Sequence, residues 1–185
     1  MPRASDAKRM TAPEYLEFEA NAEIKHEFVN GFVFAMTGGT EAHNLIIGAI
    51  YTRARLAAAG KPCRAYMEGV KLSVPSGNYY YPDVFVSCNE DEFGKDIKTT
   101  ACFVVEVLSN RTGDIDRGEK LHNYHRLEGL KAYVLVSQKS QLVEIYRALE
   151  DGTWRYETVE EGSFKLPCLD LELSLAEVYE DVELD

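Results

Sequence analysis

The chain has 185 residues, which is enough for one domain with a substantial core. Its hydrophobic fraction of 45%, without any apolar run of about 18 residues, excludes a membrane-spanning protein. The N-terminal stretch is charged and lacks the apolar segment of a secretory signal, so we expect a cytoplasmic protein. The four cysteines show no short Cys-x-x-Cys spacing, so we expect neither a structural zinc site nor a disulfide framework.

The net charge of −11 at first argues against a nucleic-acid partner, but the excess is local. Residues 1–149 hold 19 acidic and 18 basic side chains, whereas residues 150–185 hold 12 acidic and 2 basic ones. Because salt screens charges within about 8 Å, an acidic end need not repel a ligand that binds elsewhere. The sequence has no basic stripe of the kind that dedicated DNA-binding modules carry, so affinity for nucleic acid should be weak without a metal.

The first sixty residues predict a helix, a β-hairpin and a second helix. Thr11-Ala12-Pro13-Glu14 has the form of a capping box with an early proline, so a helix should begin near residue 12. Asn30-Gly31, flanked by alternating apolar residues, is a strong signal for a two-residue hairpin turn. Apolar residues at helical spacing predict a helix over 41–59, which Gly60 should end.

The rest of the chain predicts mostly strands. Ala101 to Leu108 is an apolar run broken by one charge, which is typical of a central strand buried on both faces. A helix is expected over 114–128, ending at Gly129. Further strands are predicted at 63–67, 69–74, 84–86, 133–136, 142–146 and 154–156, and a last short helix at 174–180.

This order of elements predicts the α/β class, with a mixed β-sheet flanked by helices and an N-terminal β-hairpin. No repeat, low-complexity segment or long linker divides the chain, so residues 1–185 should form a single domain. We expect residues 1–10 to be disordered and residues 167–185 to form an acidic C-terminal tail with a short helix.

Glu106 is the most informative position, because every neighbour in its segment FVVEVL is apolar. A carboxylate in such a strand is costly unless it is compensated, by a buried ion pair, an open strand end, a metal or a raised pKa. Asp83 follows Pro82 and should stand at the entrance of the next strand. Two carboxylates on neighbouring strands can share one hard cation such as Mg²⁺. We therefore favour a functional role for the pair.

An ordered set of short motifs runs from about residue 14 to residue 147. The motifs are His26-Glu27-Phe28-Val29-Asn30-Gly31, His43, Pro82-Asp83-Val84, Val105-Glu106-Val107-Leu108-Ser109, and a helix with Asp116, Lys120 and Tyr124. The set resembles the PD-(D/E)XK nuclease superfamily, and more closely its restriction endonuclease branch, the Uma-two family. The resemblance implies a restriction-endonuclease-like core, a Mg²⁺ or Mn²⁺ cofactor, and hydrolysis of a phosphodiester in nucleic acid, with DNA the expected substrate.

The resemblance also implies how the metal is held. Asp83 and Glu106 would bind it, with the backbone carbonyl of Val107 as a third ligand. Glu27 would add a third acidic group, and His43 would lie near the cleft.

One departure from the superfamily pattern concerns its lysine, whose position is Leu108 here. Leucine cannot orient water or stabilise charge on a phosphate, so we expect Lys120 to replace that lysine. Asp116, Lys120 and Tyr124 are spaced i, i+4, i+8 and therefore share a helix face. Without the resemblance, Asp116 and Lys120 would be read as an exposed ion pair worth a few tenths of a kcal/mol.

Two other groups of residues are weaker candidates. His122 and His125 stand three apart on the same expected helix and could form a metal pair, although solvated positions explain them better. Gly38-Gly39 before a helix could bind phosphate, but no GxxxxGK[ST] or GxGxxG pattern is present.

The sequence thus predicts a metal-dependent endonuclease, with catalytic residues Asp83, Glu106, Lys120 and Glu27. The alternative is a non-catalytic nuclease-fold protein that acts as a binding or scaffolding module, which Leu108 and the acidic end favour. Cleavage of two strands favours two-fold symmetry, so we expect a homodimer that acts on nucleic acid and has no membrane partner.

Overall fold

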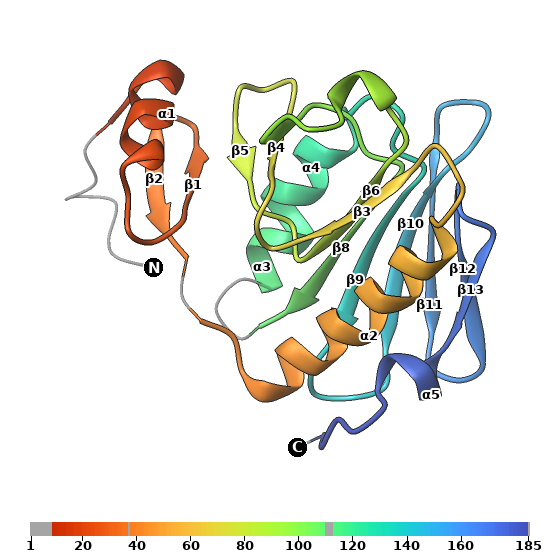
Figure 1. The fold of residues 1–185 in the computed structure, drawn as a ribbon. Coiled ribbons are helices and arrows are strands. Elements are labelled where there is room, and N and C mark those ends of the chain that lie inside the picture. The colour runs from red at the N-terminus through yellow and green to blue at the C-terminus, as the bar shows by residue number, and fades with distance from the viewer. Residues whose placement is uncertain (1–8, 37, 110–112, 185) are drawn as a thin grey trace.

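Strands and helices form layers in the computed structural model, which describes residues 9–36, 38–109 and 113–184 (Figure 1). The helices are α1 (Ala12–Ala20), α2 (Glu41–Ala57), α3 (Gly113–Ile115), α4 (Leu121–Tyr124) and α5 (Leu175–Val178). Two further helical turns are η1 (Glu90–Glu92), of 3-10 type, and η2 (Asp116–Lys120), of π type. The strands are β1 (His26–Val29), β2 (Phe32–Ala35), β3 (Arg64–Met67), β4 (Lys71–Ser73), β5 (Tyr79–Tyr80), β6 (Val84–Ser87), β7 (Ile97–Lys98), β8 (Phe103–Leu108), β9 (Ala132–Ser137), β10 (Val143–Ala148), β11 (Trp154–Val159), β12 (Ser163–Leu166) and β13 (Leu171–Ser174).

A six-stranded mixed sheet forms the centre, in the order β11-β10-β9-β8-β6-β3. Strand β8 runs parallel to β9 and antiparallel to β6, and all six of its residues are buried. A five-stranded sheet, β2-β1-β5-β4-β7, and the β12-β13 pair complete the strands of the described residues. The predicted α/β fold, with a mixed sheet flanked by helices and an N-terminal hairpin, is confirmed.

The alternation of side chains along β8 divides the core into two layers. Val105 and Val107 pack in the same cluster as Ile46 and Ile50 of α2. On the opposite face, Val104 and Leu108 pack in a cluster that includes Tyr124 of α4. Figure 1 shows α2 and α4 on different sides of this sheet. Glu106 shares the face of Val104 and Leu108, so it is a charged residue placed under the η2–α4 segment.

The N-terminal hairpin is built as the sequence predicts. Asn30 and Gly31 both have positive φ, 52° and 88°, as a two-residue type I′ turn requires. Strand β1 continues into the five-stranded sheet through its pairing with β5. The capping box at Thr11 is present, and the Met10 amide donates to the Gly31 carbonyl at 2.8 Å. Residues 1–8 of the segment expected to be disordered lie outside the described residues.

The predicted helix over 114–128 is wrong in its extent, because helical turns run from Gly113 to Tyr124 in three pieces. Beyond them the chain bends onto the sheet: the His125 ring stacks on Trp154 at 4.1 Å between centroids, and Leu127 is buried. Gly129 has positive φ, but it lies in this bend rather than at the helix end. Tertiary packing overrides the helical pattern here.

The expectation of no disulfide framework is wrong. Cys63 and Cys88 are bonded, because β3 and β6 pair antiparallel and these residues flank that pairing. Cys102, just before β8, is bonded to Cys168, which lies between β12 and β13. Both pairs are far apart in sequence: the register of β3 and β6 brings the first together, and the packing of the β12–β13 pair near the start of β8 brings the second together.

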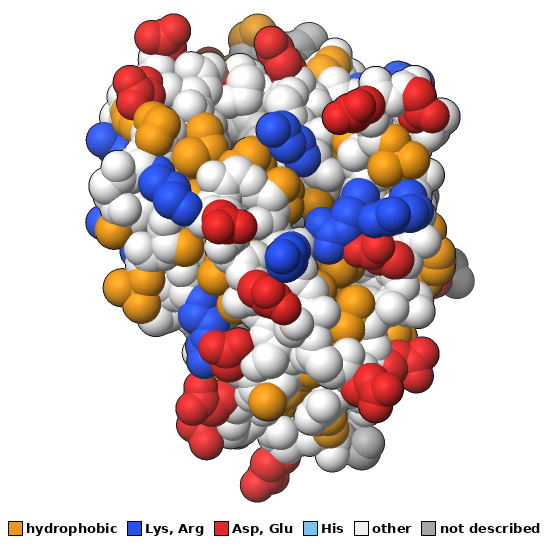
Figure 2. Space-filling model, turned by 90° about the vertical axis from the view of Figure 1, so that its right-hand side faces the viewer, with side chains coloured by type: hydrophobic (Ala, Val, Ile, Leu, Met, Phe, Trp, Pro, Cys, Tyr) orange, Lys and Arg blue, Asp and Glu red, His pale blue; other side chains and the backbone are white. Residues whose placement is uncertain are grey.

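The acidic C-terminal segment is more ordered than expected. Strand β13 pairs with β12, and Leu173 and Val178 are fully buried against the central sheet. The last helix, α5, is shorter than the expected 174–180 and begins with a Ser174–Glu177 capping box. Figure 2 views the molecule from the side of β10–β13: Lys and Arg side chains cross the middle of this face, and acidic side chains lie at both its upper and its lower end. In the described ranges, no helix is both long and apolar enough to cross a bilayer.

Two glycines allow a paired test of this backbone. We expect Gly31→Ala to lower the free energy of unfolding by about 1 kcal/mol, because its φ of 88° disfavours a Cβ. Gly48→Ala should instead raise it by about 0.5–1 kcal/mol, since a Cβ there meets nothing within 4 Å and alanine is the better helix former. Urea denaturation of both variants measures the two signs; equal shifts would contradict the turn geometry.

Candidate functional site

The candidate site begins where β6 and β8 adjoin. Their register pairs Val84 with Val105, so Asp83 and Glu106 are neighbours one step further. The Asp83 amide lies 3.4 Å from Glu106 Oε2, and the Val107 amide donates to Asp83 Oδ2 at 2.6 Å. Asp83 is 9% exposed and Glu106 3%. The sheet register therefore brings together the two carboxylates that the sequence singles out, and Val107 contacts Asp83 through its amide.

Glu106 is engaged on both carboxylate oxygens. Its Oε1 accepts hydrogen bonds from Lys120 Nζ at 3.1 Å and from the Tyr124 hydroxyl at 3.0 Å. Burial raises the pKa of Glu106 well above its ordinary value; the Lys120 charge opposes this shift, and neighbouring carboxylates such as Asp83 add to it. A buried acid with these partners is typical of functional sites in enzymes.

Lys120 is buried at 6% exposure among three carboxylates. Its Nζ lies 3.1 Å from Glu27 Oε1, 3.1 Å from Glu106 Oε1 and 3.5 Å from Asp116 Oδ1. Burial alone would lower the pKa of Lys120, but the charges of Glu106, Glu27 and Asp116 outweigh it and hold that pKa well above its ordinary value. The side chain is therefore a cation at any physiological pH, and its Nζ lies beside Glu106; its catalytic role stays a prediction.

The η2–α4 segment is anchored so that Lys120 and Tyr124 face the sheet. The Tyr80 hydroxyl donates to Glu119 Oε1 at 2.9 Å, and Asn123 Nδ2 donates to the Tyr80 oxygen at 2.8 Å. The wide π-helical turn brings both Asp116 and Lys120 to the buried side. Such turns are frequent at functional sites.

His43 reaches the same place from α2. Thr40 caps this helix by accepting from the His43 amide at 3.1 Å. Nε2 of His43 lies 3.3 Å from Asp83 Oδ2. Burial alone would lower the pKa of His43, but the hydrogen bond and the charge of Asp83 raise it above the ordinary value.

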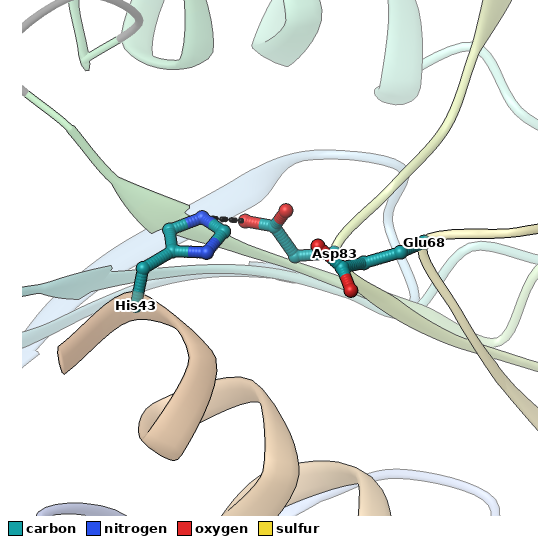
Figure 3. A group of neighbouring side chains, drawn as sticks. All are labelled: His43, Glu68 and Asp83. Atoms are coloured by element: carbon teal, nitrogen blue, oxygen red, sulfur yellow. Dashed lines mark ion pairs between the residues drawn. The ribbon is translucent and has the colours of Figure 1, made fainter. Parts of the chain in front are cut away.

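Glu68 is a site residue that the sequence does not reveal. It lies between β3 and β4 and has a positive φ of 41°. Figure 3 shows Glu68 and His43 on either side of Asp83. One ligand atom from each of the three lies within 4.8 Å of the others, which is close enough to share a metal ion. The only sequence signal is an isolated Glu-Gly step between two short strands, which names no chemistry.

Other sequence candidates lie outside this group. His125 stacks on Trp154, and burial lowers its pKa; His122 is exposed on the helix. Neither belongs to the metal-capable group found among the described residues. Leu108 is buried in the apolar core, so it contributes no polar group. Gly39 leaves room for a side chain rather than for phosphate, because a Cβ there would lie 2.6 Å from His43 Nδ1.

Comparison with known proteins shows which family the chain belongs to. The Uma2 family model, described as "Putative restriction endonuclease", matches residues 12–177. The chain belongs to the Uma2 family. The match contains every residue from Glu27 to Tyr124 that forms the candidate site.

Relatives and a solved structure agree with this membership. A Synechocystis protein named slr1290 is 34% identical over 148 residues, covering 79% of this chain and 78% of its own length. A second Synechocystis protein, sll1609, is 28% identical over 151 residues, covering 80% of this chain and 85% of its own. A crystal structure from Anabaena variabilis, titled as "a putative nuclease belonging to DUF820", has a TM-score of 0.76 at 17% identity and covers 92% of this chain and 97% of that one. This last similarity shows that the Uma2 chain shares its fold.

The buried ion pair of this Uma2 protein gives a prediction. Lys120→Met should lower the free energy of unfolding by about 3–5 kcal/mol, because it leaves buried carboxylates without their cation. Adding Glu106→Gln to Lys120→Met should restore part of the loss, so the two single effects should fail to add by about 1 kcal/mol or more. Denaturant titration of the four proteins measures this coupling.

Arg155→Met is the matched control, since Arg155 pairs with Glu157 on the surface and its side chain is 59% exposed. Its effect should stay below about 1 kcal/mol. Strict additivity of the Lys120 and Glu106 variants would show that the pair does not interact as the geometry indicates.

Proposed function

We propose that this protein is a metal-dependent phosphodiester hydrolase, an endonuclease whose nucleic-acid substrate is DNA. The observation that carries the proposal is the buried contact of Lys120 with Glu106, beside Asp83, on one face of the central sheet. A cation and two carboxylates held close together are the groups that phosphodiester hydrolysis needs. Membership of a family described as restriction endonucleases supports the same chemistry.

Asp83, Glu106 and the carbonyl of Val107 would hold the ion, Mg²⁺ or Mn²⁺. Their oxygen atoms suit a hard dication, and Asp83 and Glu106 adjoin through the 3.4 Å contact of amide and carboxylate. When bound, a divalent ion supplies polarisation of the phosphate and a lower pKa for water.

The chain's own residues would position the groups of the site and neutralise the charge that develops on the phosphate. Lys120 is a cation that can donate hydrogen bonds to phosphate oxygens as their charge grows. Tyr124 fixes the orientation of Glu106 by its hydrogen bond at 3.0 Å. Glu27 holds Lys120 from the hairpin side at 3.1 Å, so the N-terminal hairpin completes the site. In this proposal Lys120 replaces the lysine of the family pattern, whose position in the sequence is Leu108.

Nucleic acid fits the charge distribution of the chain. The acidic excess belongs to residues 150–185, and the site residues all lie before residue 125. The homodimer expected from the sequence stays a prediction.

Cleavage of plasmid and of single-stranded DNA with Mn²⁺ tests the proposal. Asp83→Ala, Glu106→Gln and Lys120→Met should each reduce the rate about 100-fold or more, because each removes a group that acts on the transition state. Chelation with EDTA should abolish cleavage by the wild-type protein.

Glu128→Gln is the control, since Glu128 is exposed beyond the helix and touches none of the site residues; its rate should be unchanged. Full activity in both Asp83→Ala and Glu106→Gln would refute the assignment. Wild-type binding of DNA without cleavage would instead favour the alternative, a non-catalytic binding module with a nuclease fold.

A further inference from the structure

The carboxylate pair is unequally available to a cation. Glu106 Oε1 accepts from both Lys120 and Tyr124, and its Oε2 faces the Asp83 amide. The contacts of Asp83 instead fall on its Oδ2, which accepts from the Val107 amide at 2.6 Å and lies 3.3 Å from His43 Nε2; Glu68 lies on the other side of Asp83 (Figure 3). The ligand atoms that lie within 4.8 Å of one another belong to His43, Glu68 and Asp83, and one of the three is a nitrogen.

The three side chains come from separate parts of the chain: α2, the turn between β3 and β4, and the residue just before β6. His43 lies in the first turn of α2, its amide capped by Thr40, and Gly39 leaves the space that the imidazole ring occupies. Glu68 is held in a left-handed conformation, and its amide contacts the carbonyls of Pro82 and Asp83 at 3.2 and 3.3 Å.

The backbone carbonyl of Glu68 is also fixed, because it accepts a hydrogen bond from Lys25 Nζ at 2.8 Å. A non-glycine residue with positive φ, held by several contacts, is a feature that functional sites often carry. The Glu68 backbone is thus constrained to lie beside Asp83.

The ligand set decides which ion fits. Mg²⁺ prefers an octahedral shell of oxygen atoms and keeps several waters. Imidazole nitrogen binds the transition-metal dications better, and their affinity for such a site rises from Mn²⁺ towards Ni²⁺. Two carboxylates and one imidazole therefore favour a transition metal over Mg²⁺.

We propose that His43, Glu68 and Asp83 form a second cation position that selects a transition-metal dication over Mg²⁺. It deepens the proposed function, on which it rests for the role of Asp83 as a ligand shared with Glu106. His43 is the residue that sets the selectivity, and Glu68 supplies the second carboxylate. The simplest competing explanation is that His43 and Asp83 form an ion pair and bind no metal.

Binding of Mn²⁺ and Mg²⁺ to the purified protein tests this, by calorimetry and by pulsed electron paramagnetic resonance of bound Mn²⁺. The wild-type protein should bind Mn²⁺ more tightly than Mg²⁺ and show coupling of the Mn²⁺ electron spin to a ¹⁴N nucleus. His43→Asn should remove that coupling and weaken Mn²⁺ binding about tenfold or more, with a smaller change for Mg²⁺. Glu68→Gln should weaken Mn²⁺ binding similarly but keep the ¹⁴N coupling.

A third variant changes none of the three ligand residues. Gly39→Ala inserts a Cβ that would lie 2.6 Å from His43 Nδ1, so it must displace the ring. It should lower Mn²⁺ affinity and alter the ¹⁴N coupling, whereas the exposed His122→Asn and Glu128→Gln should change neither. Thermal unfolding without metal confirms that each variant is folded.

Glu106→Gln separates this inference from the proposed hydrolase. If the Glu106→Gln variant binds Mn²⁺ with ¹⁴N coupling, and neither it nor the wild-type protein cleaves DNA, the cation position is supported and the hydrolase is refuted. Cleavage by a wild-type protein whose Mn²⁺ affinity is unchanged by His43→Asn and Glu68→Gln would refute the cation position and leave the hydrolase intact. Absence of any Mn²⁺ binding to the wild-type protein would overturn the inference outright.

Discussion

The site depends on one interaction, the burial of the Lys120 ammonium among the carboxylates of Glu27, Glu106 and Asp116. A carboxylate on the central strand would be strongly unfavourable without a cation, and a buried lysine would be equally so without its acids. These groups come from the hairpin, β8 and η2, so their mutual compensation ties three distant parts of the chain together. Such a cluster is weak evidence for stability, and buried charged groups with shifted pKa values occur most often at functional sites.

The two faces of the central sheet carry different kinds of side chain. On one, Val105 and Val107 pack against α2 and the β12–β13 pair in a wholly apolar cluster. On the other, Glu106 interrupts the apolar face beneath α4, next to tyrosines that donate hydrogen bonds. Asp83 lies at the edge of this polar face, where β6 begins and where α2 and the turn after β3 bring in His43 and Glu68. The edge is therefore the place where buried charge, a cation and metal-capable ligands meet.

Local patterns made much of this predictable. The capping box at Thr11, the Asn30-Gly31 turn and the apolar run around Glu106 each depend on neighbours in sequence, and all three are found as expected. Glu68, the two disulfides and the β12–β13 pair depend on the packing of distant segments, which no local spacing encodes. The helix after Gly113 ends early for the same reason, since its last residues are drawn onto the sheet. The approach of Lys120 to Glu106 could be expected from the family resemblance, but not from the helix pattern alone.

The central claim is that a divalent ion binds at Asp83, in the angle between β6, β8 and α2. A crystal structure of the protein soaked in Mn²⁺, with anomalous diffraction recorded at the manganese edge, tests it most directly. The account predicts an anomalous peak within coordination distance of an Asp83 oxygen and of the His43 imidazole. A fully soaked crystal with no peak at Asp83, or with peaks only on the acidic C-terminal surface, would contradict it.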